Sequence, residues 1–172
     1  MKKSPLLFLL ILSCAITTYS FGQTQAKSSV PVYLKDAVIP FFTIQKLDST
    51  WFTKDSLPNK RPIVLIYFSP DCGHCQWEAT EIVKNMDSLN KAFFVWISSL
   101  SLGKINTFYN TFGLNKFNNI AIGKDVKYFI PVYYSIKYDP FIVIYDKRGA
   151  YVKEFRDGVK IPDLIKALKL LY

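Results

Sequence analysis

Two cysteines, Cys72 and Cys75, lie two residues apart and directly follow an unbroken apolar run at 63–68. Such a run is typical of a strand that is buried on both faces of a sheet. The residues from Cys75 to about Leu89 carry apolar side chains at helical spacing and predict a helix. The pair is therefore predicted to lie at a strand-to-helix turn. Because free N–H groups at a helix start stabilise negative charge, we expect Cys72 to carry an exposed thiolate.

This cysteine spacing is compatible with three kinds of site. A redox dithiol needs two sulfur atoms within one turn at a helix start, which the pattern provides. A zinc site would need two further ligands, and besides His74 inside the motif only carboxylates remain. A purely structural disulfide is the third alternative, but so short a loop is seldom used for stability. We favour the redox dithiol, which requires no metal and no cofactor beyond a Cys72–Cys75 disulfide.

The third cysteine, Cys14, lies in a segment at 1–22 that is typical of a secretory signal peptide. A basic start precedes the apolar stretch 6–12, and small residues precede a predicted cleavage site after Gly22. Lipidation at Cys14 and an uncleaved anchor are the alternatives. Each of the three would deliver the protein to the periplasm or cell envelope, and the last two would tether it to a membrane.

The composition favours one globular domain. The chain has 172 residues, half of them apolar, which is enough for a substantial core. We expect a linker at 23–36 and the domain at 37–172. The formal net charge is +9, and it falls to +7 without Lys2 and Lys3 of the signal segment. Because the remaining basic residues are scattered, we expect no nucleic-acid partner and only weak attraction to acidic surfaces.

Strand and helix patterns alternate along the rest of the chain and predict an α/β fold. We expect strands at 40–44, 63–68, 92–97, 117–122, 141–145 and 150–155. We expect helices at 75–89, around 105–112, at 126–134 with an interruption near Pro131, and from 162 onward. The first of these helices is predicted to bury a stripe made of Trp77, Ile82, Val83, Met86 and Leu89.

A set of motifs between residues 37 and 172 resembles those of a known family. The Cys72-Gly73-His74-Cys75 motif follows an apolar strand, and Glu78 extends it to a C-x-x-C-x-x-E pattern. Further along, Asp139-Pro140 precedes a second apolar strand, and Gly149 lies in a hairpin turn. These motifs resemble the thioredoxin superfamily, most closely its TlpA/ResA-like branch of envelope thiol–disulfide oxidoreductases. The resemblance implies a thioredoxin-like fold, with a central mixed sheet flanked by helices and an added N-terminal β-hairpin.

The resemblance also implies an enzyme that exchanges disulfides with cysteine pairs of exported proteins. The Cys72 thiolate would attack a substrate disulfide, and Cys75 would then attack the Cys72 sulfur and release the reduced substrate. An upstream thiol reductant or oxidant, borne by the membrane, would restore the pair.

His74 stands where protein disulfide isomerases carry a histidine. We expect it to stabilise the thiolate and to give an intermediate potential within the superfamily range of roughly −270 to −120 mV. The alternative for His74 is a solvent-facing loop residue without a redox role.

Three further site residues follow from the resemblance. Glu78 matches a position that borders the active site and handles protons; alternatively, it only complements the helix dipole. Pro140 matches a cis-proline that faces the dithiol and exposes the preceding backbone for strand-like substrate pairing, and Pro131 is the rival position. The residue before Pro140 is Asp139, where the family usually has Thr or a β-branched apolar residue, and it adds negative charge beside the sulfur atoms.

Two positions depart from the family pattern. The position of the buried acid in thioredoxin is occupied by Ile66, and the position of a helix-kinking proline is occupied by Thr80. Without the strand acid, deprotonation of the second cysteine would depend more on Glu78. Trp77 and Tyr67 could border the substrate surface, but core packing is favoured for both.

Two other functions match the motifs less well. A thiol peroxidase of the peroxiredoxin kind would carry Pro-x-x-x-Thr-x-x-Cys, and Leu65 and Ser69 occupy the first two of these positions. A metal-binding assembly factor of the copper-chaperone kind would carry C-x-x-x-C and a distant histidine, whereas His74 is the single histidine of this chain. A non-catalytic binding module would not need the intact dithiol.

Overall fold

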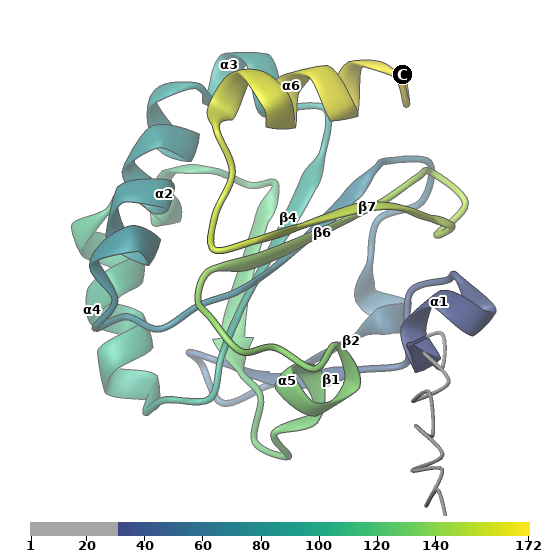
Figure 1. Ribbon diagram of the computed structural model, residues 1–172. Coiled ribbons are helices and arrows are strands. Elements are labelled where there is room, and N and C mark those ends of the chain that lie inside the picture. Colours follow the sequence, from purple (N-terminus) through teal and green to yellow (C-terminus); the bar gives the residue numbers. More distant parts are fainter. Residues whose placement is uncertain (1–30) are drawn as a thin grey trace, which may run out of the picture.

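The computed structural model describes residues 31–172, and a seven-stranded mixed sheet forms the centre of this part of the chain (Figure 1). The predicted signal segment with Cys14 and the first part of the predicted linker, residues 23–30, lie outside the described residues. Across the sheet the strands run in the order β2-β1-β5-β4-β3-β6-β7. Their bounds are β1 (Thr43–Lys46), β2 (Trp51–Thr53), β3 (Ile63–Tyr67), β4 (Phe93–Ser98), β5 (Ile120–Lys124), β6 (Phe141–Tyr145) and β7 (Tyr151–Arg156).

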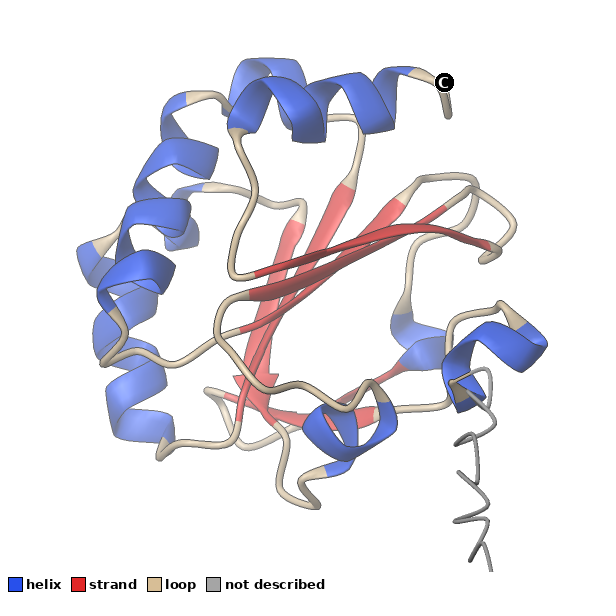
Figure 2. Cartoon of the chain, in the orientation of Figure 1, coloured by secondary structure: helices blue, strands red, loops and turns tan. Residues whose placement is uncertain are grey.

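Helices cover both faces of this sheet (Figure 2). Residues of α2, α3, α4 and α6 join the apolar cluster on one face, and residues of α1 and α5 join the cluster on the other. The bounds are α1 (Val32–Asp36), α2 (Gly73–Lys84), α3 (Met86–Leu89), α4 (Leu102–Thr111), α5 (Phe129–Tyr133) and α6 (Ile161–Lys169), with single 3-10 turns at η1 (Lys54–Ser56) and η2 (Leu114–Lys116). The predicted α/β architecture, a mixed sheet flanked by helices, is confirmed.

β3 lies inside the sheet and is buried on both faces, as its apolar composition predicts. Every residue of β3 and of the neighbouring β6 is buried. β3 pairs in parallel with β4 and antiparallel with β6, so that Ile66 lies opposite Trp96 on one side and Ile142 on the other. The loop that leaves β3 therefore starts from a strand that is held on both edges and on both faces.

The predicted hairpin forms one edge of the sheet. β1 pairs antiparallel with β2 and, on its other side, with β5. β1 begins at Thr43, later than the predicted start at residue 40. Pro40 has no N–H to donate to a neighbouring strand, and Phe41 points into solvent with 65% of its surface exposed.

The single helix predicted at 75–89 is divided into two. α2 already begins at Gly73, and Asn85 separates it from α3. The Asn85 side-chain amide donates to the carbonyl oxygen of Glu81 at 2.8 Å. A polar side chain therefore satisfies a carbonyl group at the end of α2, where the helical bonding pattern stops.

Trp77 does not belong to the buried stripe of α2. Its side chain is 53% exposed. The buried residues of α2 are Cys75, Glu78, Ala79 and Ile82. Two residues beyond Cys75 a helix has turned by about 200°, so Trp77 faces away from the core, and its predicted core packing is wrong. The same prediction is correct for Tyr67, which is buried.

Residues 32–36, predicted as part of the linker, form α1 and pack against the sheet. Tyr33 is buried, and its hydroxyl group donates to the Glu154 carboxylate of β7 at 3.2 Å and accepts from the Arg156 guanidinium at 3.0 Å. Just beyond α1, the N–H of Ile39 donates to the carbonyl oxygen of Gly149 in the β6–β7 turn. The folded part of the chain therefore begins before the predicted boundary at residue 37.

Two shorter elements also differ from their predicted form. β5 begins at Ile120 rather than at residue 117, and α5 continues across Pro131 without interruption. Pro131 is the third residue of α5. In the first turn of a helix the backbone N–H has no partner within the helix, so proline is tolerated there.

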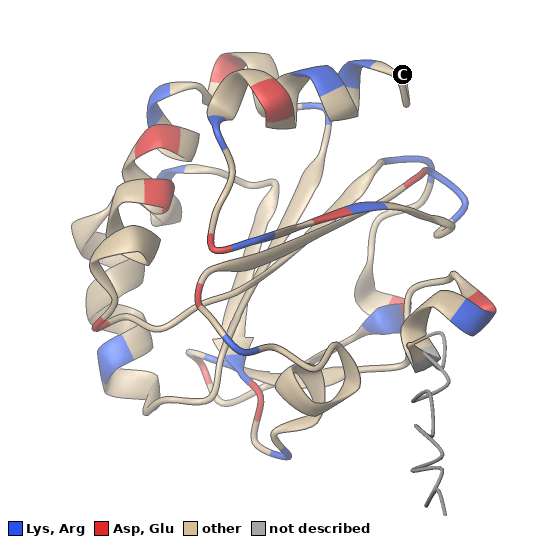
Figure 3. Ribbon diagram, in the orientation of Figure 1, with Lys and Arg blue, Asp and Glu red and all other residues tan. Residues whose placement is uncertain are grey.

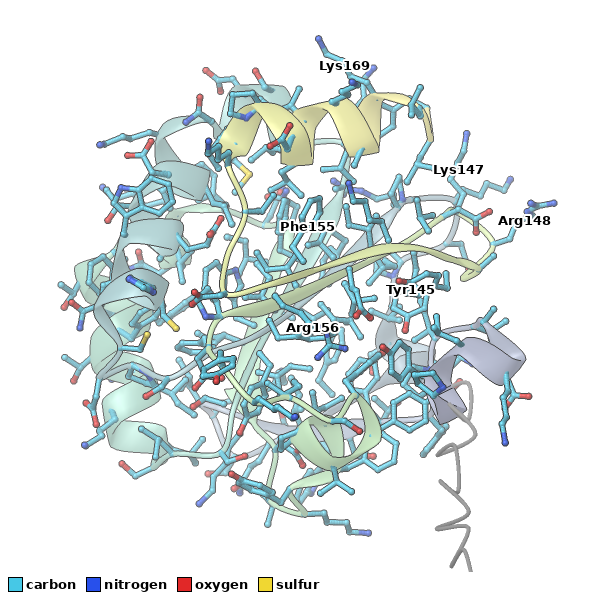
Figure 4. All side chains as sticks on the ribbon, in the orientation of Figure 1. Tyr145, Lys147, Arg148, Phe155, Arg156 and Lys169 are labelled. Atoms are coloured by element: carbon cyan, nitrogen blue, oxygen red, sulfur yellow. The ribbon has the colours of Figure 1, made fainter. Side chains whose placement is uncertain are left out.

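Charged residues are distributed over helices, strands and turns alike (Figure 3). Lys147 and Arg148 at the β6–β7 turn and Lys169 on α6 point away from the body of the protein (Figure 4). Between residues 31 and 172, no helix has both the length and the apolar character that crossing a membrane would require.

The junction between β1 and β5 depends on a glycine. A Cβ atom at Gly123 would lie 2.6 Å from the carbonyl oxygen of Gln45 in β1. We expect Gly123→Ala to lower the free energy of unfolding by about 1–3 kcal/mol, because one of the paired strands must move. Urea denaturation followed by circular dichroism measures the change. Gly103→Ala is the matched control, because no atom lies within 4 Å of its added Cβ, and we expect unchanged or slightly higher stability. Equal destabilisation of both variants would contradict the close approach of the strands.

Candidate active site

Cys72 is the N-cap residue of α2, at the end of the loop that leaves β3. Its N–H donates to the carbonyl oxygen of Ser69 at 3.1 Å, and its own carbonyl oxygen accepts from the N–H of Gln76. The side chain is partly exposed. The sulfur atom is therefore presented to solvent at the positive end of a three-turn helix, where a thiolate is stabilised.

Cys75 lies one turn further along α2 and faces the interior. Its side chain is fully buried and packs in the apolar cluster with Ile66 and Phe68 of the preceding segment. Burial raises the pKa of the Cys75 thiol far above its ordinary value, and the neighbouring Cys72 and Asp139 raise it further. Cys75 is thus held as a neutral thiol behind the exposed sulfur of Cys72.

The segment before β6 closes over Cys72 from the other side. Asp139–Pro140 is a cis peptide bond, whereas Pro131 is not preceded by one. The Cys72 thiol lies 3.6 Å from the carbonyl oxygen of Asp139, to which it donates a long hydrogen bond. The Asp139 side chain is half-buried, and burial raises the pKa of its carboxyl group. Asp139 and its cis bond to Pro140 therefore lie beside Cys72.

Glu78 is a buried carboxylic acid next to the dithiol on α2. It is 1% exposed, and its Oε2 atom accepts from the N–H of Val159 at 3.0 Å, while Oε1 has no protein partner. Burial raises the pKa of Glu78 to about 7 and outweighs the hydrogen bond from Val159, which lowers the pKa; the nearby charge of Glu81 raises it slightly further. A solvated carboxylate that only complements the helix dipole would not be buried in this way. Glu78 can instead hold or release a proton near neutral pH.

His74 differs from Glu78 in being highly exposed. Its Nδ1 atom lies 3.3 Å from Oδ1 of Asp157, and 72% of the imidazole surface is accessible. His74 is therefore not a core residue. It also differs from an isolated loop residue, because it lies in α2 and is paired with a residue of the segment that links β7 to α6.

A pocket of about 330 Å³ lies between α2 and this β7–α6 segment. It is lined by His74, Trp77, Glu78, Asp157, Gly158, Val159 and Lys160. Trp77 therefore lines a hollow next to His74 and Glu78.

Residues 157–159 also belong to the site, although none of them is among the residues expected there from the motifs. The dipeptide Asp157-Gly158 is a typical turn signal. No local sequence pattern predicts that this turn contacts His74 and Glu78, because more than 80 residues separate the turn from these two residues.

The described residues contain no cluster of three or more histidine, cysteine, aspartate or glutamate side chains placed to hold a metal ion. At position 66, where thioredoxin carries its buried acid, Ile66 is fully buried.

Known protein structures share this fold. The chain is 22% identical to DsbF of Mycobacterium tuberculosis, with a TM-score of 0.65 over 76% of this chain and 95% of that one. It is also 22% identical to a secreted M. tuberculosis disulfide oxidoreductase homologous to Escherichia coli DsbE, with a TM-score of 0.64 over 76% and 96%. A peroxiredoxin-like protein from Aquifex aeolicus is 14% identical, with a TM-score of 0.64 over 78% and 85%. No protein-family model and no curated protein matches the sequence. The fold is therefore thioredoxin-like.

The raised pKa of Glu78 predicts a specific dependence of stability on pH. The folded protein holds this proton up to about pH 7, whereas an unfolded chain releases it near pH 4.5. The stabilisation is complete below pH 4.5 and is lost as the pH rises through 7. The unfolding free energy falls by up to about 3 kcal/mol over this range. Urea denaturation of the reduced protein between pH 4 and 8 measures this loss.

Glu78→Gln is the matched control for this titration, because the amide oxygen can still accept from Val159 but cannot ionise. We expect the unfolding free energy of the wild type, relative to that of Glu78→Gln, to fall as the pH rises from 4.5 through 7. A difference that stays constant from pH 4 to 8 would show that Glu78 titrates normally.

Proposed function

We propose that the protein is a thiol–disulfide oxidoreductase that works through the Cys72–Cys75 pair. One observation carries the proposal. Cys72 is presented at the start of α2 against the carbonyl group before cis-Pro140, while Cys75 is sealed directly behind it. An exposed attacking sulfur and a protected second sulfur are what exchange with a protein disulfide requires.

The proposed reaction has two exchange steps. The Cys72 thiolate attacks one sulfur of the substrate disulfide, so that a mixed disulfide forms and the other substrate sulfur leaves as a thiolate. Cys75, once deprotonated, then attacks the Cys72 sulfur. The mixed disulfide breaks, the substrate leaves with two thiols, and the protein retains a Cys72–Cys75 disulfide. The same steps run backwards oxidise a substrate dithiol.

The second step requires a base, because burial disfavours the Cys75 thiolate. Glu78 is the buried carboxyl group one turn further along α2, and its pKa of about 7 suits it to accept this proton. The usual strand acid is replaced by Ile66, so Glu78 takes over its role in the proposed reaction. The unpartnered Oε1 atom of Glu78 is the one free to take the proton.

The proposed substrates are cysteine pairs of exported proteins in the periplasm or cell envelope. The secretory pattern at 1–22 supports this location, and lipidation at Cys14 would add a membrane tether. The proposed partner that restores the dithiol is a membrane-borne thiol reductant or oxidant, and no further cofactor is needed. The reduction potential of the pair decides the direction of electron flow: a low value points to a reductase, a high one to an oxidase or isomerase.

The two alternative functions lack support from the site. A peroxidatic cysteine would follow a proline and a threonine, but Leu65 is a core residue of β3 and Ser69 lies in the loop. The peroxiredoxin-like structure from A. aeolicus shares the fold, so the fold by itself does not separate these functions. The metal-binding alternative would need ligands that residues 31–172 do not gather.

Substitution of each cysteine tests the reaction. We expect Cys72→Ser to abolish reduction of insulin, because the buried Cys75 cannot reach a protein disulfide. We expect Cys75→Ser to accumulate a mixed disulfide through Cys72, because the resolving thiol is absent, and mass spectrometry detects this adduct. Turnover by the Cys72→Ser protein at the wild-type rate would refute the mechanism.

The same preparations separate the alternatives. Wild-type protein should reduce insulin but should not consume hydrogen peroxide in the presence of a thiol reductant. Titration of the reduced protein with Cu⁺ should give no high-affinity complex of defined stoichiometry. Rapid peroxide consumption that is lost in Cys72→Ser would identify a peroxidase, and tight stoichiometric copper binding would identify an assembly factor.

A further inference from the structure

Three consecutive residues between β7 and α6 each contact a different part of the candidate site. The Asp157 carboxylate pairs with His74 of the motif at 3.3 Å. The N–H of Gly158 donates to the carbonyl oxygen of Pro140 at 3.0 Å, and the N–H of Val159 donates to Glu78 at 3.0 Å. One turn thus touches the motif, the cis-proline segment and the buried acid.

The backbone of this turn is adapted to these contacts. Asp157 and Gly158 both adopt positive φ, at 64° and 92°. A Cβ atom at Gly158 would lie 3.0 Å from Oε2 of Glu78. The left-handed conformation of Asp157 directs its carboxylate toward α2, and Asp is among the residues that tolerate this conformation.

The Asp157–His74 contact determines which imidazole nitrogen carries a proton. A carboxylate can only accept a hydrogen bond, so Nδ1 of His74 must be the donor whether the ring is neutral or charged. In the neutral ring Nε2 is then the unprotonated nitrogen. His74 is two residues from Cys72 in the first turn of α2, and it is the residue expected to stabilise the thiolate.

We propose that Asp157 is a positioning residue that holds His74 in the orientation from which it stabilises the Cys72 thiolate. This inference rests on the thiol–disulfide exchange proposed above and extends it to a residue outside the motif. Asp157 itself does not touch Cys72. The other charged or titratable groups around the same pocket are Glu78 and Lys160, and neither is paired with the imidazole.

Two explanations for an effect of Asp157 predict opposite signs. If Asp157 acts only as a negative charge near the sulfur atoms, its removal should favour the thiolate and make the pair more oxidising. If Asp157 acts by holding His74, its removal should release the imidazole, weaken the thiolate and make the pair more reducing. The equilibrium of the pair with glutathione buffers measures this sign directly.

Two substitutions of Asp157 separate the hydrogen bond from the charge. Asp157→Gly removes the side chain, and glycine adopts positive φ readily, so the turn is kept. Asp157→Asn also tolerates this conformation and keeps an acceptor oxygen but no charge. Asp55→Asn, an exposed carboxylate in η1 near the other edge of the sheet, is the control for net charge.

We expect Asp157→Gly to shift the equilibrium constant with glutathione by about two- to five-fold in the reducing direction, the size expected for an exposed pair. Asp157→Asn should shift it less, and Asp55→Asn should not shift it. In a His74→Ala background, Asp157→Gly should give no further reducing shift. A shift in the oxidising direction, equal shifts for the Gly and Asn variants, or the same shift without His74 would each overturn the inference.

A spectroscopic measurement tests the orientation independently. The chain has a single histidine, so its ¹⁵N resonances are assigned without ambiguity. At a pH where the ring is neutral, we expect the wild type to carry its proton on Nδ1 and Asp157→Gly to revert to the Nε2–H form. A wild type in the Nε2–H form would overturn the inference while leaving the exchange reaction intact. If the wild type formed no Cys72–Cys75 disulfide in any glutathione buffer, both the inference and the proposed function would fail.

Discussion

The packing of α2 against β3 is the constraint on which the site depends. The first turns of α2 bury Cys75, Glu78 and Ala79 against the apolar strand, while the N-cap residue Cys72 stays at the rim. The same helix therefore gives its two sulfur atoms different environments: one lies in the field of the helix start, and the other lies in an apolar interior. Burial raises the pKa of the Cys75 thiol and keeps it neutral, whereas Cys72 stays accessible at the rim.

Burial of Glu78 has a cost in stability. A carboxyl group at this depth with one unpartnered oxygen is unfavourable when ionised, which is why its pKa is raised. In the proposed reaction Glu78 exchanges a proton with Cys75, because Ile66 occupies the position of the strand acid of thioredoxin. The N–H of Val159 fixes one oxygen of Glu78 and leaves the other free.

The local patterns predicted most elements, and the errors have identifiable causes. The apolar strands at 63–67 and 141–145 and the helix after the motif were predictable because a buried strand and an amphipathic helix each have their own spacing. Trp77 was misplaced because a large apolar side chain was assumed to be buried, although its helical phase relative to Cys75 directs it outward. The helix at 32–36 was missed because Tyr33 anchors it through Glu154 and Arg156 of a strand about 120 residues away.

The sequence by itself determined the dithiol at a strand-to-helix turn and the buried central strand, because these depend on neighbouring residues and on periods of two and 3.6. The tertiary structure alone decided the depth of Glu78, the contact of the Asp139 carbonyl group with Cys72, and the turn at 157–159 that joins these segments. Burial, pKa and contacts between distant segments arise only when the sheet brings the ends of β3, β6 and β7 together. No local pattern of residues encodes the distance between them.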